Sequence, residues 1–149
     1  IDHLTKVAHT EDLKEYVVFN KPNSKKVKSY CDKIETYFKK YKWGTSHCHD
    51  YSWNHVRSSN FGNPIVWFEF GDEKQNNNNT TLIMCGVHGD EITPVKFCFD
   101  VLEDLRKNPK TVANNHIIIA PLVSPDSFFK NKPQIMFLYI VQISVLKHV

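Results

Sequence analysis

The chain has 149 residues, a formal net charge of +3 with histidines neutral, and 41% hydrophobic residues. This length corresponds to one domain, and the aromatic side chains (10 Phe, 6 Tyr and 3 Trp) provide enough apolar surface for a buried core, which excludes a chain that is disordered throughout. The small charge excess argues against a nucleic-acid-binding protein. The longest apolar run, residues 135–146, is shorter than the roughly 18 residues of a membrane span, so no membrane span is expected.

The first predicted element is a helix that opens at Ser24 and stops at Gly44. Its apolar residues recur at helical spacing, and lysines fill the other face, which we interpret as a solvated surface rather than a phosphate site. Residues 1–44 are therefore assigned to an N-terminal polar and helical segment. Residues 45–133 are expected to form an α/β core, and residues 134–149 a divergent apolar tail.

The core is expected to contain three strands, at residues 64–70, 80–87 and 116–123. A helix separates the last two strands, with Thr93 as its expected N-cap and Pro94 in its first turn. Strand, helix and strand at this spacing predict a βαβ unit with parallel strands. The predicted fold class is α/β, with a mostly parallel or mixed sheet flanked by helices.

The four cysteines show no C-x-x-C spacing. Cys85 and Cys98 lie in apolar runs and are interpreted as small buried hydrophobic residues. Cys31 and Cys48 could pair, but the sequence leaves their state open, and with it the redox compartment. The chain begins with Ile1 and shows no signal peptide, so we expect an N-terminus that is processed or cut.

A candidate metal site lies between the second strand and its helix. His88 and Glu91 are three residues apart, and an imidazole and a carboxylate from one short segment can supply two of the three protein ligands of a catalytic zinc. Gly89 would let the backbone turn tightly between them, and Asp90 could orient His88. The alternative is a hydrogen-bonded turn histidine with Glu91 placed at the helix N-terminus.

Three segments in order resemble the zinc carboxypeptidases of the M14 type and their relatives, the succinylglutamate desuccinylases and aspartoacylases. Residues 82–91 (LIMCGVHGDE) resemble the first metal motif of that superfamily. Residues 59–65 (SNFGNPI) resemble its S-x-x-G-x-P-I stretch, and residues 120–128 (APLVSPDSF) resemble its N-P-D-G-F segment. The resemblance covers about residues 57–132, the N-terminal part of such a domain.

The resemblance implies a zinc-dependent hydrolase in which His88 and Glu91 are the first two metal ligands and Asp126 could contact substrate. The sequence also departs from the pattern, because Ser124 and Ser127 replace Asn and Gly, and no Arg-rich D-x-N-R stretch follows Pro133. The third ligand and the general base of the superfamily lie beyond this region. No catalytic residue is therefore assigned in this chain.

Two further regions contain histidines that are candidates for metal binding. Residues 46–50 (SHCHD), with His55 nearby, contain metal-ligand residue types but lack paired ligand spacing, and a loop without metal is expected there. His116 opens a strand, and we expect it to be satisfied by the backbone rather than to bind a metal. The sequence is equally consistent with two roles for Asp126, in a turn after Pro125 or in contact with substrate.

The sequence thus predicts a metallocarboxypeptidase-like enzyme that uses Zn²⁺-activated water to cleave a C-terminal amide bond of a small peptide, with a cell-wall peptide as one substrate class. Residues preceding the metal motif favour a peptidase over a deacylase of an N-acyl amino acid, which is the alternative. A second alternative is an inactive, truncated domain. Localisation is left open, with a periplasmic or secreted protein favoured over a cytoplasmic one.

Overall fold

The structure is a computed structural model that describes residues 17–18, 25–71, 80–112 and 115–130. The predicted apolar tail at 134–149 lies outside the described residues. Within the described ranges, no helix has both the length and the apolar character needed to cross a bilayer.

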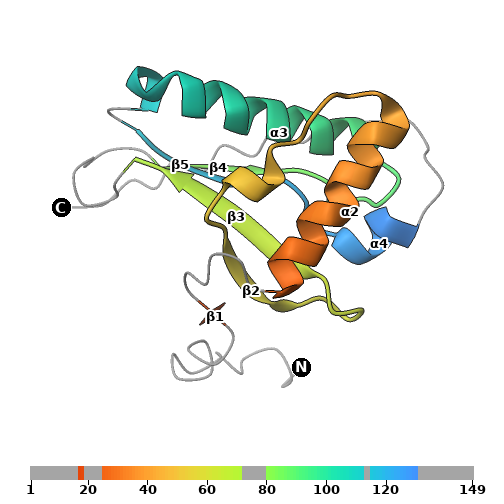
Figure 1. The fold of residues 1–149 in the computed structure, drawn as a ribbon. Coiled ribbons are helices and arrows are strands. Elements are labelled where there is room, and N and C mark those ends of the chain that lie inside the picture. Colours follow the sequence, from red (N-terminus) through yellow and green to blue (C-terminus); the bar gives the residue numbers. More distant parts are fainter. Residues whose placement is uncertain (1–16, 19–24, 72–79, 113–114, 131–149) are drawn as a thin grey trace, which may run out of the picture.

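The centre of the fold is a five-stranded mixed sheet (Figure 1). The strand order is β1-β2-β3-β5-β4, and only the β4–β5 pair is parallel among the pairings that the described strands make. The predicted α/β class with a mixed sheet flanked by helices is therefore confirmed. The strands are β1 (Val17–Val18), β2 (Asn54–Ser58), β3 (Pro64–Phe70), β4 (Thr80–Met84) and β5 (His116–Ala120).

The predicted βαβ unit is confirmed. Helix α3 (Ile92–Lys107) connects β4 to β5, and Thr80 pairs with His116 at the start of the parallel ladder. The apolar residues that recur at helical spacing along α3 are all buried, namely Val95, Cys98, Phe99, Leu102 and Leu105. The predicted N-cap was wrong, since Glu91 occupies that position and Thr93 lies inside the first turn.

Helix α2 (Lys25–Tyr41) also forms as predicted. Its buried face contacts α3 through the rings of Phe38 and Phe99, whose centroids are 5.5 Å apart, and contacts α4 (Pro125–Lys130) through Tyr37 and Phe128, at 4.8 Å. Figure 1 shows α4 beside α2. One hydrophobic cluster therefore includes residues from both sides of the predicted boundary after residue 44. The boundary itself stays a prediction.

Two short 3-10 helices, at Cys48–Asp50 and Pro109–Val112, complete the described elements. The first leads into β2, a strand that the sequence did not reveal. Residues 54–58 (NHVRS) are mostly polar, and the strand is fixed by antiparallel pairing with β3 through Val56 and Ile65 rather than by its own composition.

Candidate functional site

The candidate site lies at the carboxyl ends of β4 and β5, where ligand sites of open α/β sheets are built. The loop of residues 85–91 leaves β4 there and runs beside the segment that leaves β5. Three backbone hydrogen bonds join them, from Cys85 N to Ala120 O, from Val123 N to Cys85 O and from Ser124 N to Gly86 O, each 3.0 Å long. These bonds fix the loop against residues 120–124, so two of the segments named in the resemblance lie side by side.

Two glycines let this loop pack closely against its neighbours. A Cβ at Gly89 would lie 2.1 Å from the Ser127 Cβ and 2.7 Å from the Phe128 backbone nitrogen, so no side chain fits between the loop and α4. Gly86 has a φ of +62°, and a Cβ there would lie 2.5 Å from the Leu122 side chain. Glycine is therefore required at position 89 by the close approach of α4, whereas the expected role in a tight turn between His88 and Glu91 stays a prediction.

A disulfide joins Cys85, the first residue of the loop, to Cys98. The sequence left the number of disulfides open, and this bond forms because the end of β4 and the second turn of α3 bring the two sulfur atoms together. Both residues are buried, at 2% and 0% exposure, so the sequence correctly placed them in the core and missed only the bond. The disulfide ties the first residue of the candidate loop to α3.

His88 and Glu91 are held within one turn, since the Glu91 backbone nitrogen donates to the His88 carbonyl oxygen at 3.2 Å. His88 is exposed and Glu91 is half-buried. Glu91 is the N-cap residue of α3, but its side chain makes no capping hydrogen bond. Both predicted ligands therefore lie at the surface of the candidate site, on a loop whose backbone is fixed.

The described residues do not complete a metal site. No group of three or more His, Cys, Asp or Glu side chains able to hold one ion occurs within residues 25–71, 80–112 and 115–130. His88 and Glu91 supply two donors of the types that zinc accepts, and a catalytic zinc takes three protein ligands. The two residues thus fit part of a zinc site and leave the third ligand unassigned.

Asp126 forms the connection between α4 and the turn of residues 59–63. Its Oδ1 accepts hydrogen bonds from Ser59 Oγ (2.5 Å) and Asn63 Nδ2 (2.8 Å), and its Oδ2 accepts one from the Phe61 backbone nitrogen (3.0 Å). Burial alone would raise the pKa of this carboxyl, but these hydrogen bonds outweigh it and hold the pKa below its usual value. The turn role considered for Asp126 is what the contacts favour, and its contact with substrate stays a prediction.

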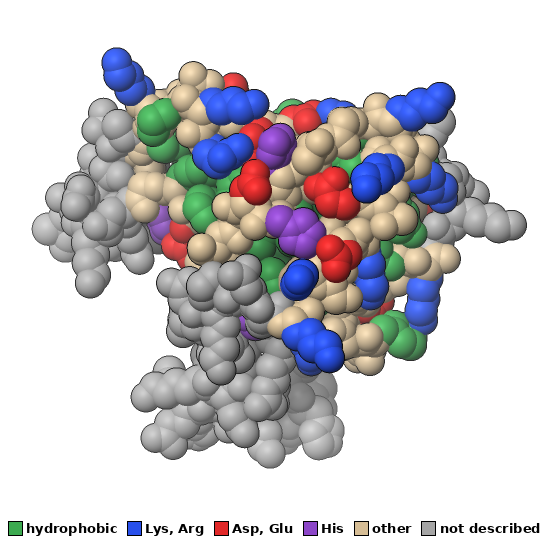
Figure 2. All heavy atoms as spheres, in the orientation of Figure 1, with side chains coloured by type: hydrophobic (Ala, Val, Ile, Leu, Met, Phe, Trp, Pro, Cys, Tyr) green, Lys and Arg blue, Asp and Glu red, His purple; other side chains and the backbone are tan. Residues whose placement is uncertain are grey.

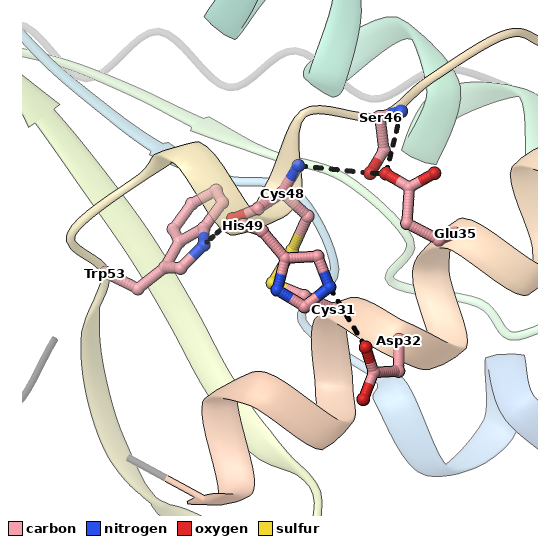
Figure 3. The surroundings of a disulfide bond; sticks show 7 residues. All are labelled: Cys31, Asp32, Glu35, Ser46, Cys48, His49 and Trp53. Carbon is pink, nitrogen blue, oxygen red and sulfur yellow. Dashed lines mark hydrogen bonds and ion pairs between the residues drawn. A yellow bond between two sulfur atoms is a disulfide. The ribbon is translucent and has the colours of Figure 1, made fainter. Parts of the chain in front are cut away.

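The histidine-rich segment at 46–50 is organised by a second disulfide, Cys31–Cys48 (Figure 3). His49 Nε2 lies 3.0 Å from Asp32 Oδ1, and His47 Nδ1 lies 3.0 Å from Asp50 Oδ2, so the two histidines have separate acidic partners. The Cys48 sulfur is bonded to Cys31 and is not a free thiolate, which is the form of cysteine that binds metals. The segment connects α2 to β2 and is held by these contacts, and the expectation that it binds no metal stays a prediction.

His116 is buried in a polar network at the opposite end of the parallel strands. Its Nε2 lies 3.1 Å from Glu69 Oε2, and its Nδ1 lies 3.2 Å from Thr80 Oγ1. The prediction that His116 has hydrogen-bond partners is confirmed, but the expected backbone partners were wrong. Side chains from the two neighbouring strands take that place, because β5 lies between β3 and β4.

A polar cluster that the sequence did not reveal covers the side of α3 that faces Tyr51. The Tyr51 hydroxyl donates to Glu103 Oε1 at 2.7 Å, and the Arg106 guanidinium binds the same carboxylate through two nitrogens at 2.7 and 3.0 Å. Burial, with the bond to Glu103, raises the pKa of Tyr51 far above its usual value, so this hydroxyl stays a donor. Tyr51 and Arg106 line an open pocket of about 450 Å³ with an apolar wall that includes Phe68 and Leu105.

The chain matches no protein-family model and no curated protein. Among solved structures it matches one titled the structure of bovine thrombin-activatable fibrinolysis inhibitor in complex with tick carboxypeptidase inhibitor, with 16% sequence identity and a TM-score of 0.45. The match covers 66% of this chain, and the chain spans 32% of the matched one. A match at this level carries no argument about activity, so the argument for function depends on the residues of this chain.

Proposed function

We propose that this chain carries the first part of the active site of a zinc-dependent hydrolase, with His88 and Glu91 as two of the metal ligands. The observation that supports this most directly is their placement, within one tight turn at the carboxyl end of a parallel strand. A zinc ion bound there would polarise a substrate carbonyl and lower the pKa of a bound water.

The fixed backbone around the two residues also supports the proposal. The loop is joined to residues 120–124 by hydrogen bonds, closed against α4 at Gly89 and tied to α3 by the Cys85–Cys98 disulfide. Ligands on such a loop lose little conformational freedom when a metal binds. His88 remains exposed, so a metal ion can reach it from solvent.

The proposed substrate is a small peptide cleaved at its C-terminal amide bond, with a cell-wall peptide as one class, and the alternative is an N-acyl amino acid. The third ligand and the general base would come from outside the described residues. Without them the domain would be inactive, because two ligands hold zinc weakly and its water is poorly activated. We further propose a periplasmic or secreted location, since two disulfides persist in oxidising compartments.

Zinc binding by the full chain tests the proposal. In a competition titration against a chromophoric chelator, we expect binding of one zinc ion at micromolar free metal, weakened at least about tenfold in His88→Ala and in Glu91→Gln. His49→Ala is the matched control, because it removes an exposed histidine with an acidic partner outside the loop, and its zinc affinity should equal that of the wild type. Absence of bound metal at micromolar free zinc would contradict the proposal for this chain.

Two further measurements separate the alternatives. Hydrolysis of a chromogenic peptide with a free C-terminus, but not of an N-acyl amino acid, would favour the peptidase, and the reverse would favour the deacylase. A chain that binds zinc and hydrolyses neither would be the inactive domain. The nucleotide sequence after the codon for Pro133 is also informative, since a frame that encodes D-x-N-R followed by a later His and Glu would supply the missing ligand and base.

A further inference from the structure

A pocket of about 400 Å³ lies between the first half of α2 and the turn that joins β2 to β3. Its helix wall carries three lysines, Lys25, Lys26 and Lys33, and its turn wall runs from Phe61 to Pro64. No Asp or Glu is among the residues that line it in the described part of the chain. Figure 2 shows Lys and Arg side chains over the lower part of this face, where Figure 1 places the N-terminal end of α2.

The charge arrangement at this helix end lacks its usual compensation. The N-terminus of a helix carries a partial positive charge, which acidic residues in the first turn commonly offset. The first turn of α2 has no acidic residue and instead begins with Lys25 and Lys26. The lysine charges are repelled by the partial positive charge at this end of the helix and by one another. An anion bound in the pocket would reduce both repulsions.

One of the three lysines is held in position. Lys33 Nζ donates to Asn63 Oδ1 at 2.6 Å, and Asn63 in turn donates to Asp126 through its Nδ2. Asn63 is only 7% exposed, so the acceptor that orients Lys33 belongs to the folded core of the turn. The Lys33 ammonium also lies 5.2 Å from the centroid of the Phe129 ring, so this ring and Asn63 together hold it, and a ligand would accept from an N–H that is not donated to Asn63.

One residue of the pocket lining, Tyr30, also carries a buried hydroxyl. Tyr30 lines the pocket, is only 1% exposed, and its hydroxyl has no hydrogen-bond partner within the described structure. Burial raises its pKa far above the usual value, so the group stays protonated and can only act as a neutral donor or acceptor. A buried hydroxyl without a partner costs stability, and a ligand oxygen that reached it would remove that cost.

We propose that this pocket binds an oxyanion, a phosphate or carboxylate group, through Lys25, Lys33 and the Tyr30 hydroxyl. Lysine ammonium groups recognise such groups as point charges, and the helix N-terminus adds to the same field. Phe61 is 65% exposed at the rim, where it offers an apolar surface to the rest of the ligand. The site is separate from the loop of His88 and Glu91 and does not depend on the proposed metal.

The test is calorimetric titration of the full chain with inorganic phosphate at low ionic strength, with acetate in a parallel arm. We expect millimolar or tighter binding of at least one of the two, weakened about tenfold in Lys25→Gln/Lys33→Gln, because hydrogen bonds to charged groups are lost. The matched control is Lys28→Gln/Lys39→Gln, which removes two lysines of the same helix that do not line the pocket. Its affinity should change less than about threefold, the size expected for a screened long-range charge effect.

Tyr30→Phe separates the pocket from a general charge effect. This variant keeps every charge and removes a hydroxyl that has no partner, so the protein should fold, and anion affinity should fall by about threefold to tenfold. If phosphate binds more tightly than acetate, the ligand group is a phosphate. If acetate binds more tightly, the ligand group is a carboxylate. Equal losses in the pocket and control variants, or no heat with either anion at millimolar concentration, would overturn the proposal.

Discussion

A histidine and a glutamate lie near each end of the parallel pair β4–β5, and the surroundings of the two histidines differ. At the amino end, His116 is 5% exposed and lies between Glu69 and Thr80. At the carboxyl end, His88 is exposed on a loop with a fixed backbone, three residues before Glu91. Histidine is thus buried and paired within the sheet at one end and exposed at the other. Residue type alone does not identify a site, whereas exposure on a rigid backbone favours one.

Adding a methyl group at Gly89 should destabilise the region at the carboxyl end more than any other change proposed below. Because the new Cβ would meet the Ser127 and Phe128 backbone, Gly89→Ala should lower the free energy of unfolding by more than about 3 kcal/mol. Gly44→Ala is the control: Gly44 has a φ of +84° but no atom within 4 Å, so only backbone strain of about 1–2 kcal/mol is expected. Urea denaturation measures both, and equal losses would show that the close contact with α4 is not needed.

Removal of the Cys85–Cys98 disulfide should have the next largest effect. Its sequence separation of 13 residues predicts a loss of about 3 kcal/mol in Cys85→Ser/Cys98→Ser, and the Cys31–Cys48 disulfide, with a separation of 17, predicts a similar loss. Only the first variant should also weaken zinc binding, since only that disulfide holds the candidate loop. Denaturation and chelator competition on both variants check this, and a zinc affinity that fell equally in both would argue against a local role.

Substitution of His116 and His88 compares the two ends of the parallel strands directly. His116→Ala removes a buried side chain and its two contacts, with the exposed Glu69 carboxylate and the half-buried Thr80 hydroxyl, and should cost about 1–3 kcal/mol of unfolding free energy, with zinc affinity unchanged. His88→Ala changes an exposed side chain and should cost less than about 0.5 kcal/mol while weakening zinc binding. Denaturation curves combined with zinc titrations measure the two effects, and a large loss of stability in His88→Ala would contradict the assignment.

The smallest effect concerns the pH dependence of the Asp126 contacts. The folded-state pKa of Asp126 is lowered, so its stabilising contribution is complete above its unfolded-state value of about 3.9 and is lost as pH falls through the lower folded-state value. Asp126→Asn should therefore be less stable than the wild type at neutral pH, and the difference should shrink below about pH 4. Unfolding free energies measured from pH 7 to pH 2 test this, and a difference independent of pH would rule out the charged form as the source.

Much of the fold could be predicted because it depends on local apolar periodicity. The apolar stripes of α2 and α3 determine which face of each helix packs inward, and the apolar runs at β4 and β5 indicate strands without defining a buried face. Strand β2 could not be predicted, since its polar residues acquire strand structure only through pairing with β3. The position of β5 between β3 and β4 also depends on contacts distant in sequence.

The candidate site shows the same division. The spacing of His88 and Glu91 follows from one short segment, and the sequence was sufficient for it, whereas the need for glycine at position 89 depends on α4, which lies far away in the sequence. The Cys85–Cys98 bond was missed because an apolar setting explains a buried cysteine equally well with or without a partner. The network around Asp126 joins residues more than 60 positions apart, and no local pattern indicates which hydrogen bonds that carboxylate accepts.

The two disulfides are also ordered along the chain, since Cys31 pairs with Cys48 and Cys85 with Cys98. Four cysteines allow three pairings, and this is the one in which each cysteine bonds to its sequence neighbour without crossing the other bridge. As the chain emerges during synthesis, the first bridge can close before the third cysteine is made. Oxidative folding can then proceed from the amino end without reshuffling of bonds, so the helix α2 region can be secured before the candidate loop exists.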